Sequence, residues 1–184
     1  MVRVWCHLTS IVNCSLQVFH LHNNHLTTLP DQLVALHRLR SLAIPFNRFI
    51  TLPAVAAQMT HVLVSDVEAV SLAGNSIERL SSDALTELKY TKRLDLRLNE
   101  LTLPPTDTLK FVVLERLSHL DVRDNHISEL DLRVLRSLEC LNCERNSMVS
   151  LRLNGTSLRN LAAAGNRECL EVVVVISNSA ALST

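Results

Sequence analysis

Glycine, aromatic residues and net charge are all scarce in this 184-residue sequence. Its three glycines, Gly74, Gly155 and Gly165, are too few and too scattered to form a glycine-rich phosphate loop, which excludes the common nucleotide-binding motifs. The 18 Lys and Arg residues balance the 18 Asp and Glu residues, so no general attraction draws the chain to nucleic acid or to an anionic membrane. No stretch reaches the roughly 18 consecutive apolar residues of a transmembrane helix. We therefore expect neither nucleic-acid binding nor membrane insertion.

Cysteines are few and show no regular spacing. Their number, five, is odd, so a disulfide scaffold is not expected and a reducing compartment fits the sequence better. The N-terminal stretch MVRVWCHLTSIVNC is broken by polar residues and has no continuous apolar segment of signal-peptide length. Without an export signal, the glycosylation sequon at residues 154–156 carries little weight. These features predict a cytoplasmic protein.

Leucine is abundant, and it recurs in a fixed frame. The pattern Leu-x-x-Leu-x-Leu-x-x-Asn-x-Leu-x-x-Leu, with other apolar residues at some leucine positions, is found seven times between residues 16 and 166, although the seventh copy loses the pattern after its asparagine. The asparagines of the seven copies are Asn24, Asn47, Asn75, Asn99, Asn125, Asn146 and Asn166. They follow one another at intervals of 20 to 28 residues, which is the period of leucine-rich repeats. The sequence therefore predicts a repeat solenoid rather than a leucine-rich helical bundle.

The frame predicts an α/β solenoid, a right-handed curved array with a parallel sheet on its concave side. Its Leu-x-Leu core alternates with period two, so both leucines point to one face of a short strand. The asparagine has an amide donor and a carbonyl acceptor, so it can satisfy the backbone groups left unpaired where the chain leaves the strand. Residues 30–39 and 81–89 combine capping residues with helical spacing of apolar residues. We expect the convex returns to be short helices, 3₁₀ turns or irregular segments.

The residues between the strand leucines, and the two before each asparagine, are expected on the concave face. In the first three repeats these are histidines and small or apolar residues, whereas the next three repeats supply both signs of charge. The candidate surface of repeats four to six consists of Arg93, Asp95, Arg97, His119, Asp121, Arg123, Asp124, Asn142, Glu144 and Arg145. Two interpretations remain open. The residues form either a solvated ladder of cross-strand pairs, each worth less than about 1 kcal/mol, or a docking surface for a protein partner with arginines as anchors.

Catalytic and metal-binding motifs are missing from the sequence. It contains no H-E-x-x-H and no G-x-S-x-G. His20 and His22 could share one strand face, but a zinc site needs about four ligands and the next repeat offers none at the equivalent places. Salt bridges to nearby arginines explain Asp121 and Asp124 more simply than acid–base catalysis does. We expect no enzyme activity, no metal and no cofactor in this chain.

Cys140 and Cys143 have the spacing of redox and zinc motifs, but the repeat frame separates them. Cys143 takes the position of the second strand leucine and is expected in the core, where free cysteine acts as a small hydrophobe. Cys140 precedes the first strand leucine and points the other way. The two thiols are therefore not expected to bind one metal or to form a disulfide.

The order of the repeat variants resembles the array of the PH-domain and leucine-rich-repeat protein phosphatases. RLDLRLNEL is followed by HLDVRDNHISELDL, and then by a shortened repeat with Cys143 in the core position and an Arg-Asn pair after it. A repeat of the form G-x-x-L-x-x-L-x-A-x-x-N comes next, from Gly155 to Asn166. The corresponding segments are 95–99, 121–125, 143–146 and 155–166, and the resemblance covers about residues 16 to 166.

The resemblance implies that this chain is part of a larger signalling protein. Family members join a PH domain, the repeat array, a metal-dependent PP2C-type phosphatase domain and a PDZ-binding tail, and they dephosphorylate Akt and some protein kinase C isoforms. No catalytic domain is recognised here, so the implied role is scaffolding or substrate engagement through a protein partner on the concave face. A parent protein of this family would also allow a nuclear or membrane-associated location. The alternative is a free-standing intracellular leucine-rich-repeat adaptor unrelated to phosphatases.

Three segments are expected along the chain. Residues 1–15 form a non-repeat N-terminal segment or partial cap, residues 16–166 the repeat domain, and residues 167–184 a divergent tail. The tail contains the uncharged run VVVVI, which is expected to form a last strand and is an aggregation hazard on an open edge. Because repeat arrays normally need polar caps, we expect poor solubility of the isolated chain.

Overall fold

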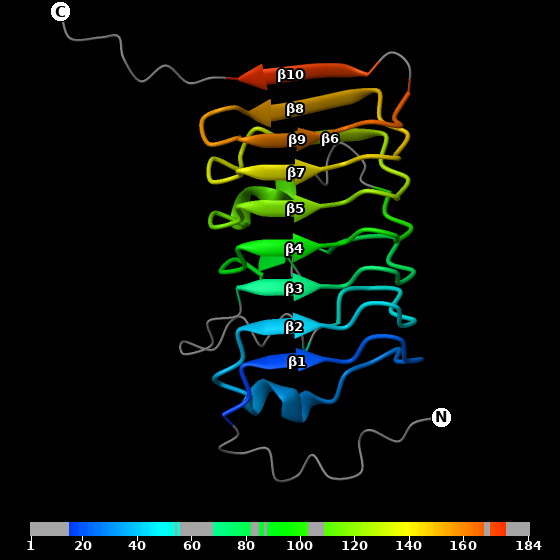
Figure 1. The fold of residues 1–184 in the computed structure, drawn as a ribbon, viewed down its shortest axis with the longest axis vertical. Helices are drawn as coiled ribbons and strands as arrows, with labels where there is room; N and C mark the ends of the chain where they lie inside the picture. The colour runs from blue at the N-terminus through cyan, green and yellow to red at the C-terminus, as the bar shows by residue number, and fades with distance from the viewer. Residues whose placement is uncertain are drawn as a thin grey trace, which may run out of the picture.

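The strands of successive repeats stack into one elongated solenoid (Figure 1). The computed structural model describes residues 15–53, 55, 68–81, 85–86, 88–102, 109–167 and 170–175. Seven strands form a parallel sheet in the order β1-β2-β3-β4-β5-β7-β9. They are β1 (Val18–His20), β2 (Ser41–Ala43), β3 (Ala69–Ser71), β4 (Arg93–Asp95), β5 (His119–Asp121), β7 (Cys140–Asn142) and β9 (Asn160–Ala162). The parallel-strand solenoid predicted from the repeat frame is confirmed.

The register of this sheet follows the repeat frame without a slip. The central residue of each strand pairs with the central residue of the next, as Leu94 does with Leu120 and Leu120 with Leu141. These leucines are 2% exposed, and the second leucine of the frame, Leu96 in β4's repeat, is fully buried. Because side chains alternate along a strand, the pattern that fixes the register also fixes which face is buried.

A second, smaller sheet lies on the return side of the solenoid. It contains β6 (Glu129–Leu132), β8 (Ser150–Asn154) and β10 (Glu171–Val175), all parallel, in the order β10-β8-β6. The repeat frame did not predict this sheet, because helical or irregular returns were expected. Its local signal is the alternation in SELDL and SLRLN, whose leucines are at most 1% exposed. An extended return covers about 3.3 Å per residue, which suits the two shortest repeats, of 21 and 20 residues.

The earlier returns contain 3₁₀ helices. One, η2 (Asp31–Ala35), follows Pro30 and buries Leu33, as the helical spacing of residues 30–39 predicted. Another, η3 (Leu109–Val113), places Phe111 in the core. Of the return expected at 81–89, residues 85 and 86 are helical, and part of the rest lies outside the described residues. Among the described residues, no helix combines the length and the apolar character that a membrane span would need.

A continuous apolar core runs between the two sides of the solenoid from Leu21 to Leu153. It contains one polar substitution at a leucine position, because Thr91 begins the fourth repeat and is fully buried. Its hydroxyl has no hydrogen-bond partner among the described residues. Residues 1–14 and 176–184 lie outside the described structure, so only the last residue of the expected N-terminal segment is described.

Candidate protein-binding surface

The frame's asparagine closes the turn that ends each strand. Asn99 donates from Nδ2 to the carbonyl of Leu96 at 2.9 Å and to that of Leu72, in the preceding repeat, at 3.0 Å. Its Oδ1 accepts the backbone N–H of Ile77, also in the preceding repeat, at 3.0 Å. The same arrangement recurs at Asn47, Asn75, Asn125, Asn146 and Asn166. Each of these asparagines therefore joins two repeats by satisfying backbone groups that would otherwise be unpaired.

The first asparagine of the ladder differs from the other six. Asn24 donates to the carbonyls of Leu21 and His22, both at 3.1 Å and both in its own repeat. No described strand precedes its repeat, so its side chain closes a local turn without joining two repeats.

The residue before each asparagine has a left-handed backbone conformation in all seven repeats. Their φ values lie between 49° and 70°, at Asn23, Phe46, Gly74, Leu98, Asp124, Arg145 and Gly165. Left-handed φ is unfavourable for residues with a Cβ, yet only two of these seven are glycine. Glycine at position 74 is favoured for a second reason besides its backbone conformation, because a Cβ there would collide with the Phe46 ring. The turn therefore fixes the direction in which these seven residues leave the sheet.

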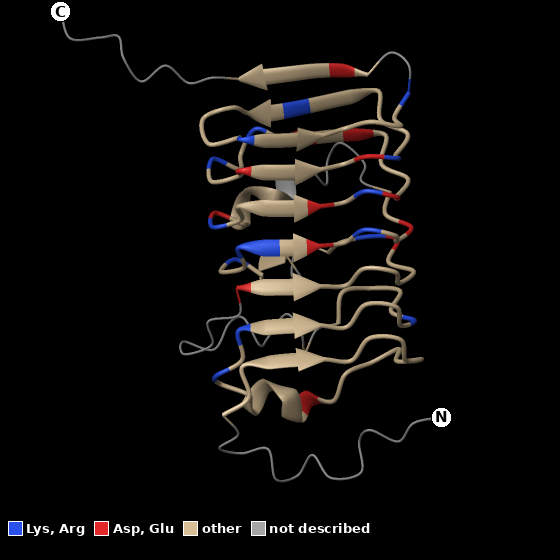
Figure 2. Cartoon of the chain, viewed as in Figure 1, with Lys and Arg blue, Asp and Glu red and all other residues tan. Residues whose placement is uncertain are grey.

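The outer face of the seven-stranded sheet contains a groove of about 730 Å³ that extends from β2 to β9. We call it the strand-face groove; its walls are the first and third residues of each strand. In its centre Arg93 pairs in register with His119, and Asp95 pairs with Asp121. Figure 2 shows that charged residues gather on β4 and β5 and in the loops after them, whereas β1 and β2 carry no charge. The charge gradient read from the sequence is thus a gradient along this face.

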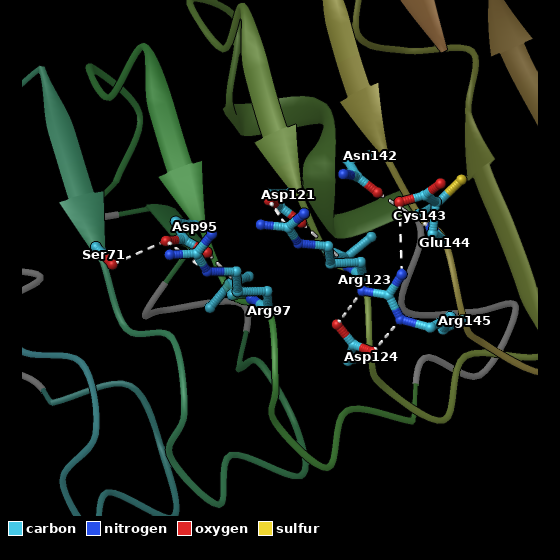
Figure 3. A network of polar contacts seen from close by, with 12 residues as sticks. Ser71, Asp95, Arg97, Asp121, Arg123, Asp124, Asn142, Cys143, Glu144 and Arg145 are labelled. Carbon is cyan, nitrogen blue, oxygen red and sulfur yellow. Dashed lines mark hydrogen bonds and ion pairs between the residues drawn. The ribbon is translucent and has the colours of Figure 1, made fainter. Parts of the chain in front are cut away.

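The structure places the ten candidate residues on three consecutive repeats, in two groups. Arg93, Asp95, His119, Asp121 and Asn142 line the strand-face groove. Arg97, Arg123, Asp124, Glu144 and Arg145 follow the strand ends and lie together beside it (Figure 3). We call this second group the strand-end cluster.

The third residue of each of these strands has a structural role. Oδ1 of Asp95 accepts the backbone N–H of Arg97 at 3.3 Å, and Oδ1 of Asp121 accepts that of Arg123 at 3.2 Å. Asn142 does the same for Glu144 at 3.2 Å. The position therefore suits Asp or Asn, whose short side chains reach the backbone two residues ahead.

All three arginines of the strand-end cluster already have carboxylate partners. Nε of Arg97 lies 3.5 Å from Oδ2 of Asp95, and Nε of Arg123 lies 3.3 Å from Oδ2 of Asp121. Arg145 contacts both carboxylate oxygens of Asp124, at 2.5 and 2.8 Å (Figure 3). These pairs are partly exposed, so each contributes at most about 1 kcal/mol to stability. A partner would have to compete with them to use these arginines as anchors.

The pKa values of Asp121 and Asp124 are shifted in opposite directions. Burial in the groove raises the pKa of Asp121 above its ordinary value, although the N–H and guanidinium of Arg123 oppose this effect. The hydrogen bond from Arg145 lowers the pKa of Asp124. The groove floor thus disfavours negative charge, whereas the strand-end cluster stabilises it.

Arg93 is the cation of the groove that remains available. Arg93 is exposed, and its side chain forms no hydrogen bond or ion pair with the described residues, whereas its backbone N–H donates to the carbonyl of Glu68. His119 next to it is held by a 2.9 Å contact between its Nδ1 and Oγ of Ser118. The candidate residues chosen from the sequence did not include some other groove residues, among them Cys140, Arg159 and Asn160. For Cys140 and Asn160 the signal was present, because these two residues are partners in the register of the sheet.

Cys140 and Cys143 lie on opposite sides of the sheet. Cys143 is fully buried, its Sγ contacts the carbonyl of Ala162 at 3.4 Å, and burial raises its pKa to about 12. Cys140 faces the groove, where its sulfur accepts from Nδ2 of Asn160 at 3.4 Å. No group of three or more His, Cys, Asp or Glu side chains in the described part of the chain could hold a metal ion.

The parallel strands and the asparagine ladder define a leucine-rich-repeat fold. Residues 15–36 match the family model described as Leucine Rich Repeat. A leucine-rich-repeat protein of Leptospira interrogans has a TM-score of 0.64 at 20% identity, over 85% of this chain and 42% of that protein. The leucine-rich-repeat domain of APL1B has a TM-score of 0.70 at 19% identity, over 87% of this chain and 46% of that domain. At these identities the likeness concerns the fold alone.

The repeat region is like that of the PH-domain leucine-rich-repeat protein phosphatases. The chain is 39% identical over 100 residues to PH domain leucine-rich repeat protein phosphatase 1 of Rattus norvegicus. The match covers 54% of this chain and 6% of the rat protein. The chain therefore carries a repeat region similar to that of this phosphatase, and it spans a small part of the length of this relative. The fold itself points to a non-catalytic repeat module.

Proposed function

We propose that the chain is a protein-interaction module that binds its partner in the strand-face groove. The observation that carries this proposal is the continuous groove of about 730 Å³ over β2 to β9, with the exposed, unpaired Arg93 at its centre. The groove is built on paired strands rather than on loops, so its side chains are held in place before a partner arrives. The partner would lie along the sheet and meet Arg93 and His119 first.

The ion pairs beside the groove support a more specific division of roles. Because Arg97, Arg123 and Arg145 already contact carboxylates, they contribute orientation and charge pattern more than binding energy. Arg93 can form a bidentate contact with a carboxylate or phosphate of the partner without first breaking a pair. The anchor of the surface is therefore Arg93, and the strand-end cluster forms its polar rim.

The likeness to the rat phosphatase supports a role in intracellular kinase signalling. In that role the chain contributes scaffolding or substrate engagement, with Akt or protein kinase C as the signalling target, and a catalytic domain elsewhere performs hydrolysis. The PH and phosphatase domains of such a parent protein are part of this proposal. A leucine-rich-repeat adaptor unrelated to phosphatases would use the same groove with a different partner.

A matched pair of double variants tests the groove. Arg93→Ala with His119→Ala removes an arginine and a histidine from the groove, and Arg152→Ala with His126→Ala removes the same residue types elsewhere on the surface. Partners captured from cytosol are identified by mass spectrometry, and their affinities for the purified variants are measured by calorimetry. We expect the groove variant to weaken binding about tenfold or more, a loss of at least about 1.4 kcal/mol, and the control to leave it unchanged.

Two outcomes would count against parts of the proposal. Equal binding by both double variants would place the interface outside the groove. A partner that needs the groove but is unrelated to Akt and protein kinase C would support the proposed protein-interaction module. It would favour an adaptor unrelated to phosphatases over a role in a phosphatase.

A further inference from the structure

The outer edge of β10 is not paired with any other described strand. β10 pairs with β8 over five residues, from Glu171 opposite Ser150 to Val175 opposite Asn154, and on its other side it has no partner among the described residues. Figure 1 shows it at the extreme C-terminal end of the solenoid, beyond β9. An edge strand presents a row of unpaired N–H and C=O groups that another strand can use.

The sequence of β10 is that of an interior strand. Val172 and Val174 continue the inward rows of Leu151 and Leu153, yet they are 43% and 45% exposed, whereas the two leucines are fully buried. On the outward side, Val173 of β10 lies opposite Arg152 of β8, so the outward residue is polar in β8 and apolar in β10. Both faces of β10 are thus apolar from residue 172 to residue 175. Strands of this composition are normally covered on both faces and paired on both edges.

The far edge of the same sheet does not offer a complementary strand. That edge is β6, and η3 packs against it. A head-to-tail contact would need an open strand there to receive β10 of the next molecule. The open edge of β10 therefore finds its complement in an identical edge, and identical edges meet through a two-fold axis.

We propose that two copies of this chain associate through their β10 strands, paired antiparallel, to form one six-stranded sheet in the order β6-β8-β10-β10-β8-β6. Like edges related by a two-fold axis form regular hydrogen bonds only when the strands are antiparallel. When the axis passes through Val173, Val172 lies opposite Val174 of the second copy and Glu171 lies opposite Val175. Valine then meets valine, and no like charges face each other.

This symmetry has a consequence for the strand-face groove. A two-fold axis perpendicular to the shared sheet leaves both sheets facing the same direction, so both grooves open to the same side of the dimer. A partner with two copies of a recognition segment could engage both grooves, and the second contact would be intramolecular. The association itself does not depend on what the groove binds.

Substitution at the centre of the shared edge tests the pairing. Val173→Lys places a charge on the two-fold axis, where it meets its own copy, but leaves the inward valines unchanged. Val112→Lys is the matched control, because Val112 is 54% exposed on η3, away from β10. We expect light scattering with size exclusion to give twice the 20.6 kDa chain mass for the wild type and the control, and the single-chain mass for Val173→Lys. Hydrogen exchange at residues 172–174 should accelerate about tenfold or more in Val173→Lys alone.

Each other result would overturn the proposal. A wild-type monomer excludes self-association, and a series of larger masses indicates head-to-tail polymers. A dimer that persists in Val173→Lys places the interface elsewhere, and loss of the dimer in Val112→Lys shows a non-specific effect. If Val173→Lys does not fold by circular dichroism, Val175→Glu, which would face Glu171 of the second copy, takes its place with the same expected masses.

Discussion

At the scale of single residues, the frame's asparagine contributes the most specific interaction in the fold. Asn99 is 6% exposed and serves two carbonyls and one N–H. Replacing it with alanine leaves these buried groups unpaired, and each unsatisfied group costs about 1–3 kcal/mol. We expect Asn99→Ala to lower the free energy of unfolding by about 3 kcal/mol or more, measured by urea denaturation with circular dichroism.

The first asparagine provides the control for this prediction. Asn24 bonds only to carbonyls of its own repeat among the described residues, and one of these hydrogen bonds is exposed to solvent. Asn24→Ala should therefore lower the free energy of unfolding by less than about 1 kcal/mol. Equal losses in the two variants would mean that the bonds between repeats contribute nothing beyond the local turn.

The sequence predicted some residue-level features and not others. The role of asparagine followed from its donor and acceptor, and the separation of Cys140 from Cys143 followed from strand alternation. The left-handed turn was not predicted, since Phe46 and Leu98 adopt it against their own preference. Only Gly74 and Gly165, at the equivalent places of two repeats, hinted at it. The ion pairs of the arginines could not be predicted either, because the repeat frame determines which face a residue lies on but not which side chain it contacts.

At the scale of elements, the row formed by β4, β5 and β7 couples charge to stability. Asp121 has a raised pKa in the folded chain because of burial, so the folded state binds its proton more tightly than the unfolded state does. Stability from this group therefore falls as pH rises from 3.8, the ordinary pKa of an aspartate, through the raised folded pKa, and it does not change above that range. Asn142 holds the same hydrogen bond in β7 as a neutral residue. We expect Asp121→Asn to gain stability relative to the wild type as pH rises from 3 to 7, seen as a shift of the urea midpoint.

Asp124 should give the opposite sign in the same measurement. The hydrogen bond from Arg145 lowers its folded-state pKa, so its contribution to stability is present above pH 3.8 and is lost as pH falls through the lowered pKa. Asp124→Asn should therefore lose stability relative to the wild type as pH rises over the same range. Curves of the same sign for the two variants would contradict the assignment of burial to one carboxyl and ion pairing to the other.

The sequence predicted the seven strands better than it predicted the returns. Strand alternation and the asparagine agree on one register, so the two signals reinforce each other. The returns carry weaker signals, because a short apolar run such as SLRLN is compatible with a strand or a helix. The short length of the returns in the last two repeats favours the second sheet. That length depends on the spacing between neighbouring repeats and not on the residues of the return itself. β10 then became its edge rather than the next strand of the larger sheet.

At the scale of the whole molecule, the described strands of the solenoid contact mainly the strands of neighbouring repeats. β1 packs on β2, β2 on β3, and so on along the sheet, and β6, β8 and β10 repeat this pattern on the return side. Stability in such an array is close to a sum of repeat and nearest-neighbour terms. Terminal repeats have one neighbour instead of two, so they open at a smaller free energy than the central ones.

This arrangement predicts an asymmetric pattern of hydrogen exchange. Backbone amides of β3, β4 and β5 should exchange most slowly, and those of β1 should exchange faster by on the order of tenfold or more. If two chains share the β10 edge, the C-terminal end of the wild type is protected like an interior and only the N-terminal end frays. In Val173→Lys both ends should fray to a similar extent. Uniform exchange in all strands of both proteins would instead indicate all-or-none opening, and the nearest-neighbour description of this chain would be wrong.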